Sequence, residues 1–253
     1  MNGRLEGRVA LITGTGGGMG RAAALRFAEE GAVIVGCDLN LEANEETAAA
    51  VKAADGRMSA AAPVDLGDSA AARTWVEQAA EEHGGIDIVY NNASAARFGP
   101  VGTLPEEDWH FTVRNEVDLV FYVTQSAWPY LTQRGGVVIN IASLAGHTAS
   151  RAVPMLAHAA TKGAILAMTR QLAAEGAPHG IRAVSISPGV IETPGTAGQF
   201  ADPVVLDALR AQLLVPRPGL PKDVVGLAAF LASDEASYIT GTDFVVDGGM
   251  SAI

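Results

Sequence analysis

Residues 9–20 have the sequence VALITGTGGGMG, in which an apolar run of strand length passes directly into a glycine-rich turn. An alanine-rich segment of helical composition follows and ends near Gly31. Glycines let a backbone approach a pyrophosphate closely, and the N-terminus of the next helix presents free N–H groups to it. The order of strand, glycine turn and helix predicts a dinucleotide site, although a glycine cluster by itself is equally typical of a flexible turn.

A second apolar run favours the nucleotide interpretation. Residues 33–38, VIVGCD, have the length of a strand and end in Asp38, about 20 residues after the glycines. A carboxylate at this point accepts hydrogen bonds from ribose hydroxyls and repels a 2′-phosphate. We therefore expect NAD rather than NADP as the cofactor.

The composition is that of one compact domain. With 253 residues, 49% hydrophobic content and 29 glycines, the chain can bury a large core. No Pro/Ser-rich linker or low-complexity stretch divides it, so we expect a single domain over residues 1–253.

Charge and hydropathy exclude several classes of protein. A net charge of −11 argues against nucleic-acid binding, which needs basic surface. No apolar stretch approaches the roughly 20 residues that span a membrane, and the N-terminus is polar, so we expect a cytoplasmic protein without a membrane partner. Cys37 is the only cysteine, which excludes an internal disulfide. We expect no metal site, because His83, His110, His147 and His179 lack metal-ligand spacing.

Short apolar runs continue along the chain and alternate with segments of helical length. They occupy residues 59–64, 86–90, 137–141, 181–186 and 243–246. Strands separated in this way favour a parallel sheet with helices on both faces. We therefore predict an α/β fold, a Rossmann-type doubly wound parallel sheet.

Taken together, the motifs resemble those of the short-chain dehydrogenase/reductase family over essentially the whole chain. Residues 13–20 are similar to the family's TGxxxGxG turn, residues 91–93 to the start of NNAG, and residues 188–193 to PGxxxT. The resemblance implies oxidoreductase activity, a small-molecule substrate and a homotetramer. It also implies cofactor contacts from Gly14, Gly18, Met19, Asp38, Leu39, Asp65, Leu66, Asn92, Lys162, Pro188, Ile191 and Thr193.

The expected catalytic residues depart from the family pattern. Ser143 falls on the family's catalytic serine, but His158 stands where the family has tyrosine, one helical turn before Lys162. The family's structural asparagine corresponds to Glu116, or to Asn115 if the register shifts by one residue. Such a shift turns a side chain by about 100°, so we expect only one of the two to face the site. Ser94 replaces the last glycine of NNAG, which we interpret as a tolerated substitution.

A histidine at this position suggests a neutral general base. Free imidazole ionises near pH 6.5, about neutrality, and a neighbouring ammonium favours its neutral form. We expect His158 to accept a hydroxyl proton, Ser143 to hold the substrate oxygen and Lys162 to hold the nicotinamide ribose. Glu116 would support this by pairing with His158 or by neutralising Lys162. Against this role, imidazole is shorter than phenol, and a misplaced base loses much of its effect.

The rest of the pocket is less specified by the sequence. Residues 194–218 correspond to the family's substrate lid and carry few charges, which favours an apolar or cyclic secondary alcohol or ketone. Phe98 is expected to border the cleft. Two other functions stay open: a lyase or isomerase that uses the Glu116 and His158 pair, and a nucleotide-binding protein with weak catalysis.

Overall fold

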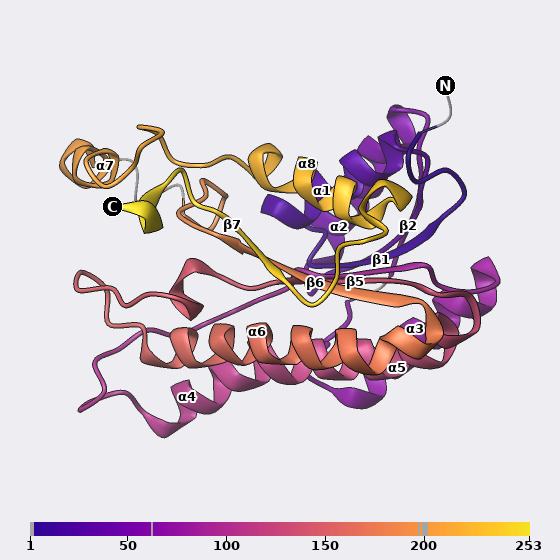
Figure 1. Cartoon of the computed structure of the whole chain (residues 1–253), viewed down its shortest axis with the longest axis horizontal. Coiled ribbons are helices and arrows are strands. Elements are labelled where there is room, and N and C mark those ends of the chain that lie inside the picture. Colours follow the sequence, from indigo (N-terminus) through magenta and orange to yellow (C-terminus); the bar gives the residue numbers. More distant parts are fainter. Residues whose placement is uncertain (1–2, 62, 197, 199–201) are drawn as a thin grey trace.

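The structure, a computed structural model, describes residues 3–61, 63–196, 198 and 202–253. Within these residues seven parallel strands form one sheet in the order β3-β2-β1-β4-β5-β6-β7 (Figure 1). The strands are β1 (Val9–Thr13), β2 (Val33–Cys37), β3 (Arg57–Ala60), β4 (Ile88–Asn91), β5 (Gly136–Ile141), β6 (Ile181–Pro188) and β7 (Asp243–Val246). The chain order reverses between β1 and β4, and parallel α/β sheets bind ligands at the carboxyl ends of strands at such a point.

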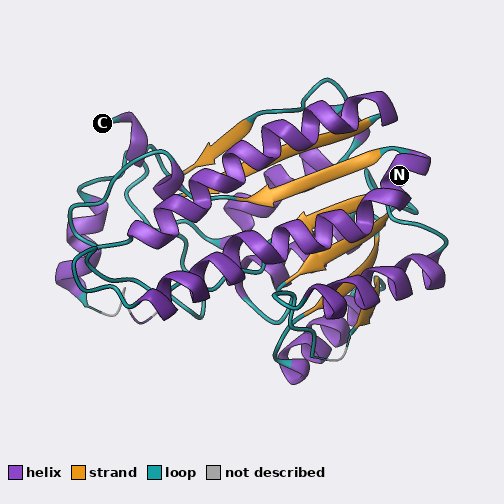
Figure 2. Ribbon diagram, turned by 90° about the horizontal axis from the view of Figure 1, so that it is seen from below, coloured by secondary structure: helices purple, strands orange, loops and turns teal. Residues whose placement is uncertain are grey.

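Helices cover both faces of the sheet, as Figures 1 and 2 show. One layer holds α1 (Gly18–Glu29), α2 (Leu41–Ala53) and α8 (Pro221–Ala232). The other holds α3 (Ser69–His83), α4 (Glu106–Val113), α5 (Leu119–Arg134) and α6 (Leu156–Gly176). A π-helical turn, η1 (Arg114–Asp118), joins α4 to α5, and a 3₁₀ turn, η2 (Leu144–Gly146), precedes α6. The predicted doubly wound parallel sheet is confirmed.

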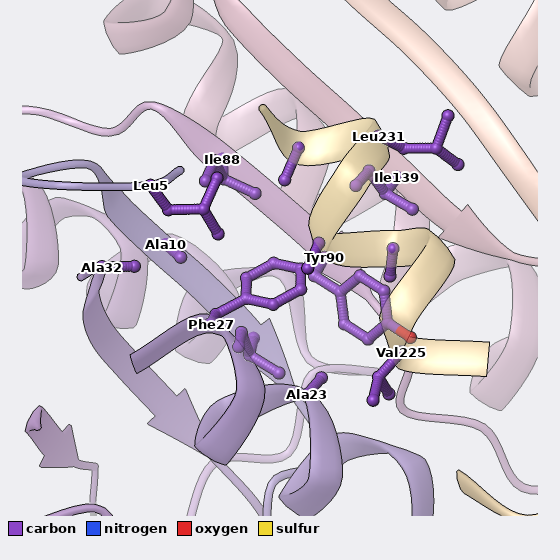
Figure 3. Packing of buried hydrophobic residues seen from close by; sticks show 14 of the residues in the cluster. Leu5, Ala10, Ala23, Phe27, Ala32, Ile88, Tyr90, Ile139, Val225 and Leu231 are labelled. Atoms are coloured by element: carbon purple, nitrogen blue, oxygen red, sulfur yellow. The ribbon is translucent and has the colours of Figure 1, made fainter. Parts of the chain in front are cut away.

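Alternate residues of β1, β2, β4, β5 and β6 enter two hydrophobic clusters, one on each face. In β1, Ala10 and Ile12 pack with α1 and α8, whereas Val9 and Leu11 pack on the opposite face. This alternation follows from the pleat of a strand, and burial on both faces explains why the strands are continuous apolar runs. In Figure 3, Phe27 of α1 meets Tyr90 of β4 edge-on, with ring centroids 5.6 Å apart.

The predicted strand at residues 59–64 is wrong in its bounds. β3 ends at Ala60, and the following chain leaves the sheet at the cavity described below. There the backbone N–H of Val64 donates to the carbonyl of Asp38 at 3.2 Å. The apolar run is longer than the strand because Val64 and Leu66 still pack in the core after the pairing with β2 stops. Ala62 lies outside the described residues.

A short helix occupies part of the predicted lid. This helix, α7 (Pro203–Arg210), lies beyond the end of the sheet in Figure 1 and leaves Val204 and Val205 exposed. The lid positions 197 and 199–201 lie outside the described residues. No helix in the described part of the chain is both long and apolar enough to cross a membrane.

Candidate active site

A cavity of about 420 Å³ opens at the carboxyl ends of β1, β2 and β4. It lies at the point where the strand order reverses. Most of the residues predicted to bind the cofactor line it. These are Gly14, Gly18, Met19, Asp38, Leu39, Asp65, Leu66, Asn92 and Thr193.

The glycine turn forms one wall of this cavity through its backbone. Gly14 and Gly18 have φ angles of +75° and +50°, which residues with a Cβ rarely adopt. A Cβ on Gly20 would stand 1.9 Å from the carbonyl oxygen of Gly14, so the helix packs directly against the turn. Around Gly17, by contrast, no atom lies within 4 Å of an added Cβ. The turn therefore leaves open space in front of the N-terminus of α1, where an anion can bind.

Two carboxylates on the cavity wall are held by specific donors. Asp38 accepts hydrogen bonds from the backbone N–H of Gly16 at 2.8 Å and of Asn40 at 2.9 Å. Asp65 accepts from the guanidinium of Arg114 at 2.7 Å, and this hydrogen bond is the main reason why the pKa of Asp65 lies below its usual range. Both carboxylates are therefore held in fixed positions on the cavity wall, and the charge of Asp65 is balanced by Arg114.

The hydroxyl of Thr13 ties the turn to β4. Its Oγ1 accepts hydrogen bonds from the backbone N–H groups of Asn92 and Ala93, each at 2.9 Å. The side chain of Asn92 returns a hydrogen bond to the carbonyl of Thr13 at 3.0 Å. The strands on the two sides of the cavity are thus fixed to each other by polar contacts.

Glu116 lies at the centre of a second group of residues, next to the cavity. Its side chain is completely buried, and Oε1 and Oε2 lie 2.9 and 3.0 Å from Nδ1 of His158. Ser94 donates to Oε1 at 2.6 Å, Thr161 donates to Oε2, and Nζ of Lys162 lies 3.8 Å from Oε1. One carboxylate therefore meets an imidazole, an ammonium and two hydroxyls.

The π-helical turn η1 explains how this carboxylate reaches the site. Such turns are rare and occur mainly as single bulges, often at functional sites. Asn115 donates to the carbonyl of Phe111 at 2.8 Å and lines the cavity, while Glu116 contacts His158. Of the two neighbours, Glu116 contacts His158 and Asn115 lines the cofactor cavity, so the prediction that Glu116 rather than Asn115 serves the reaction stays a prediction.

The charges of the cluster balance each other. Burial alone would raise the pKa of Glu116, but the hydrogen bond from His158 and the charge of Lys162 outweigh it, and the net pKa is lowered. Burial lowers the pKa of Lys162, and the neighbouring Glu116 opposes that change. Because an ionised carboxylate can only accept, Nδ1 of His158 carries a proton, and in the neutral imidazole Nε2 therefore has a free lone pair.

The aromatic ring of Phe98 borders the imidazole of His158. The two rings meet edge-on with centroids 5.6 Å apart, and Phe98 is 53% exposed. The loop of Phe98 is joined to the segment before α6 by a bridge between Gly99 and Met155. This contact places an apolar surface beside the candidate base.

Four other predicted residues lie outside the cavity wall. The hydroxyl of Ser143 accepts from the backbone N–H of Ala145 at 3.1 Å, and Lys162 donates to the carbonyl of Ile141 at 3.0 Å. Pro188 ends β6, and Ile191 forms a bridge with Gly219.

His147, which directly follows η2, contacts the strands β6 and β7 rather than the group of residues around Glu116. Its Nε2 lies 2.9 Å from Oδ2 of Asp243 and 3.2 Å from Oγ of Ser187, at the strands β6 and β7. Within the described ranges, no three His, Cys, Asp or Glu side chains gather as metal ligands do.

A family model described as enoyl-(acyl carrier protein) reductase matches residues 14–251, nearly the whole chain, with the glycine turn at its start. The chain belongs to the short-chain dehydrogenase/reductase family. It is therefore an oxidoreductase by family, and its relatives include dehydrogenases of alcohols, sugars and steroids.

Individual relatives match this dehydrogenase/reductase along its full length. A 2,5-dichloro-2,5-cyclohexadiene-1,4-diol dehydrogenase from Sphingobium indicum is 39% identical over 254 residues, 99% of each chain. A 3-oxoacyl-[acyl-carrier-protein] reductase from Thermotoga maritima is 34% identical over 250 residues, which cover 98% of this chain and 99% of the relative. The solved structure of a 7α-hydroxysteroid dehydrogenase complexed with NADH and 7-oxo glycochenodeoxycholic acid superimposes with a TM-score of 0.93 at 28% identity. The match covers 98% of this chain and 96% of the other.

Three residues of this dehydrogenase/reductase site were not singled out as functional from the sequence. Thr161 contacts Glu116, Arg114 holds Asp65, and Ser94 joins the cavity wall to Glu116. Thr161 lies three residues after His158 on one helix, a spacing that places both on the same face. No comparable signal points to Ser94, because its partner lies 22 residues away in a different element.

Proposed function

We propose that this protein is an NAD-dependent dehydrogenase that interconverts a secondary alcohol and a ketone, with His158 as the group that accepts or returns the proton. The observation that carries the proposal is the hydrogen bond from Nδ1 of His158 to the buried carboxylate of Glu116. That bond leaves the lone pair of Nε2 available to a substrate hydroxyl. A general base needs a fixed tautomer with a free lone pair directed at the proton that it accepts.

The residues of the cavity fit a dinucleotide. The open space at Gly17 and the N-terminus of α1 would hold the pyrophosphate, Asp38 the adenosine ribose, and Asp65 and Leu66 the adenine. When bound, NAD⁺ supplies the acceptor for a hydride. The fixed charge of Asp38 supports NAD over NADP, because it would repel a 2′-phosphate.

In the oxidative direction the electrons and the proton leave the alcohol separately. The carbinol carbon would lose its hydrogen together with the electron pair of the C–H bond, for which a bound NAD⁺ would be the acceptor. The hydroxyl proton moves to Nε2 of His158, and the C–O bond becomes the carbonyl. The resulting imidazolium is stabilised by Glu116, which already accepts the hydrogen bond from Nδ1. In the reverse direction the same imidazolium returns its proton.

Lys162 would have two tasks in this mechanism. Its ammonium balances the charge of Glu116 at 3.8 Å, which keeps the carboxylate ionised in a buried place. A contact of Lys162 with the nicotinamide ribose stays a prediction from the family resemblance, as does a contact of Ser143 with the substrate oxygen.

The surface beside His158 supports an apolar, ring-bearing substrate. Phe98 meets the ring of His158, and Val153 and Leu156 expose apolar side chains in the segment around Met155, the residue that forms a bridge with Gly99. Cyclic compounds also appear in the names of a cyclohexadienediol dehydrogenase and a hydroxysteroid dehydrogenase among the relatives. A lid over residues 194–218 that closes on such a substrate, a homotetrameric assembly and a cytoplasmic location are further parts of the proposal.

A single-turnover experiment tests the proposed function. Wild type and His158→Ala are mixed with NAD⁺ or NADP⁺ and a panel of cyclic and linear secondary alcohols, and nicotinamide absorbance is followed. We expect NADH formation that is about 10³-fold slower in the variant, with NAD⁺ affinity unchanged within about threefold. Equal rates in the two proteins would exclude His158 as the base. Tight NAD⁺ binding and conversion of substrate without NADH formation would favour a lyase or isomerase.

A further inference from the structure

We propose that Ser94 is a positioning residue for proton transfer, which holds the carboxylate of Glu116 in the orientation that His158 requires. This inference rests on the proposed function, because it assigns a role to Ser94 in the proton transfer by His158. It goes beyond that function in naming a residue that acts through Glu116 from the wall of the cofactor cavity.

Ser94 connects the solvent-exposed wall of the cavity to the buried carboxylate of Glu116. Ser94 is exposed on the cavity wall beside Ala93 and Asn115, whereas the side chain of Glu116 is fully buried. The two are joined by the 2.6 Å hydrogen bond from Oγ of Ser94 to Oε1. A cofactor in the cavity would cover this hydroxyl from water and strengthen the bond, since hydrogen bonds to charged groups gain strength as water is excluded.

Each oxygen of Glu116 has one hydroxyl donor. Ser94 donates to Oε1 and Thr161 to Oε2, while Nδ1 of His158 lies nearly equidistant from both oxygens. Two donors on opposite oxygens fix the plane of the carboxylate, and that plane fixes the imidazole. Without the hydroxyl of Ser94, the remaining partners of Oε1 are the imidazole of His158 and the ammonium of Lys162. Attraction to Lys162 would then turn the carboxylate out of its present plane.

Ser94 also moderates the charge that His158 senses. Its hydrogen bond stabilises the anion of Glu116 and so weakens the pull of that anion on an imidazolium. Among the described residues, the titratable groups that contact Glu116 are His158 and Lys162, both from α6. Loss of the hydroxyl leaves more charge on Oε1, and the protonated form of the His158–Glu116 pair persists to higher pH.

The test compares the pH dependence of kcat and kcat/KM in wild type, Ser94→Ala and Ser94→Thr, using NAD⁺ and an alcohol that the wild type oxidises. For Ser94→Ala we expect kcat to fall about tenfold, the size of one hydrogen bond to a charged group. The midpoint of the acidic limb of the kcat/KM profile should shift to a pH about half a unit higher. The NAD⁺ dissociation constant should stay within about threefold of the wild-type value. Ser94→Thr keeps a hydroxyl and should recover most of kcat and the original limb.

Thr124→Val is the matched control. Thr124 is buried and accepts a hydrogen bond at 3.1 Å from Asn91 in the strand before Ser94, but it has no contact with Glu116. Its loss should leave the acidic limb in place. A Ser94→Ala enzyme with the wild-type limb and kcat within twofold would overturn the proposal, as would an equal shift in Thr124→Val.

Failure of this inference is distinguishable from failure of the proposed function. If His158→Ala is inactive and Ser94→Ala has the wild-type profile, only the role of Ser94 is wrong. If His158→Ala keeps its activity, the proposed function itself fails. If Ser94→Ala does not fold, Ser94→Gly replaces it, because glycine is the residue of the family motif at this position. The same fall in kcat and the same shift of the acidic limb are expected for Ser94→Gly, and their absence overturns the proposal.

Discussion

The part of the cavity that we propose for the adenosine and pyrophosphate, here called the adenosine end, and the part that we propose for the reaction, here called the reacting end, are built on different principles. At the adenosine end the glycine turn presents backbone to the ligand, and Gly20 packs against the carbonyl of Gly14 without room for a side chain. At the reacting end, side chains from two segments, the chain after β4 and helix α6, meet on the carboxylate of Glu116 in η1. One end depends on main-chain geometry and the other on a network of side-chain charges and hydroxyls.

The difference explains why the family pattern is kept at one end and changed at the other. A main-chain cradle cannot be altered locally, because each added Cβ either collides with backbone or enters the ligand's space. A side-chain network can change its members if the charges still balance, since the scaffold carries the site without dictating its chemistry. His158 and Glu116 stand at the positions where the family resemblance implies two other residues, and Glu116 offsets the charge of Lys162.

The largest effect that would test this contrast is expected for Glu116→Gln. An amide nitrogen facing Nδ1 of His158 would favour the tautomer with the proton on Nε2, which cannot accept one. We expect kcat to fall about 10³-fold while the NAD⁺ dissociation constant changes less than about threefold. The matched control is Glu106→Gln, since Glu106 is an exposed carboxylate 3.4 Å from another histidine, His110, and its loss should be silent. A large loss of NAD⁺ affinity in Glu116→Gln would mean that the two ends are not independent.

The same variant gives a pH-dependent stability difference. The pKa of Glu116 is lowered in the folded protein, so its ionised form stabilises the fold at pH values above the unfolded pKa of about 4.3. This stabilisation is lost as the pH falls through the folded pKa. Wild type should therefore exceed Glu116→Gln in unfolding free energy at pH 7 by about 2–4 kcal/mol. Urea unfolding should show that gap narrowing below about pH 4. A constant gap would contradict the ionised state of Glu116.

At the adenosine end, Gly17→Ala separates folding from ligand binding. An alanine methyl there meets no atom within 4 Å, and φ of −171° is extended backbone that alanine adopts freely. We expect an unfolding free energy within about 0.5 kcal/mol of wild type, but an NAD⁺ dissociation constant raised about 30-fold. Calorimetric titration measures the second quantity. Gly20→Ala is the contrasting variant, because its methyl would collide with Gly14 and the fold itself should weaken. Unchanged NAD⁺ affinity in Gly17→Ala would move the pyrophosphate elsewhere.

The smallest of these effects is expected for Asp38→Asn. The amide keeps one oxygen acceptor, so one of the two hydrogen bonds from Gly16 and Asn40 is lost, and it removes the charge that disfavours a 2′-phosphate. The preference for NAD⁺ over NADP⁺ in kcat/KM should fall about tenfold. Asp68→Asn, at the N-terminus of α3 and outside the cavity wall, should leave the preference unchanged. If both variants behave alike, net charge rather than Asp38 sets the cofactor preference.

The sequence by itself determined the fold class, the order of alternating strands and helices, and the position of the glycine turn. These features follow from local physics: apolar runs of strand length, the backbone freedom of glycine, and burial of both faces of a parallel sheet. It failed at the end of β3, because Val64 and Leu66 are apolar for core packing rather than for strand pairing.

The sequence already named Glu116 as a possible partner of His158, but only the tertiary structure decided how that pair is made and which other residues hold it. The π-helical turn η1 points Glu116 at the imidazole and Asn115 at the cavity, and a change of helical pitch has no reliable mark in a single sequence. The tertiary structure also brings together Ser94 and Thr161, which are 67 residues apart in the chain, so that each donates to one oxygen of the Glu116 carboxylate. The sequence could name the candidate base because its spacing from Lys162 is local, whereas the partners of that base depend on contacts between distant elements.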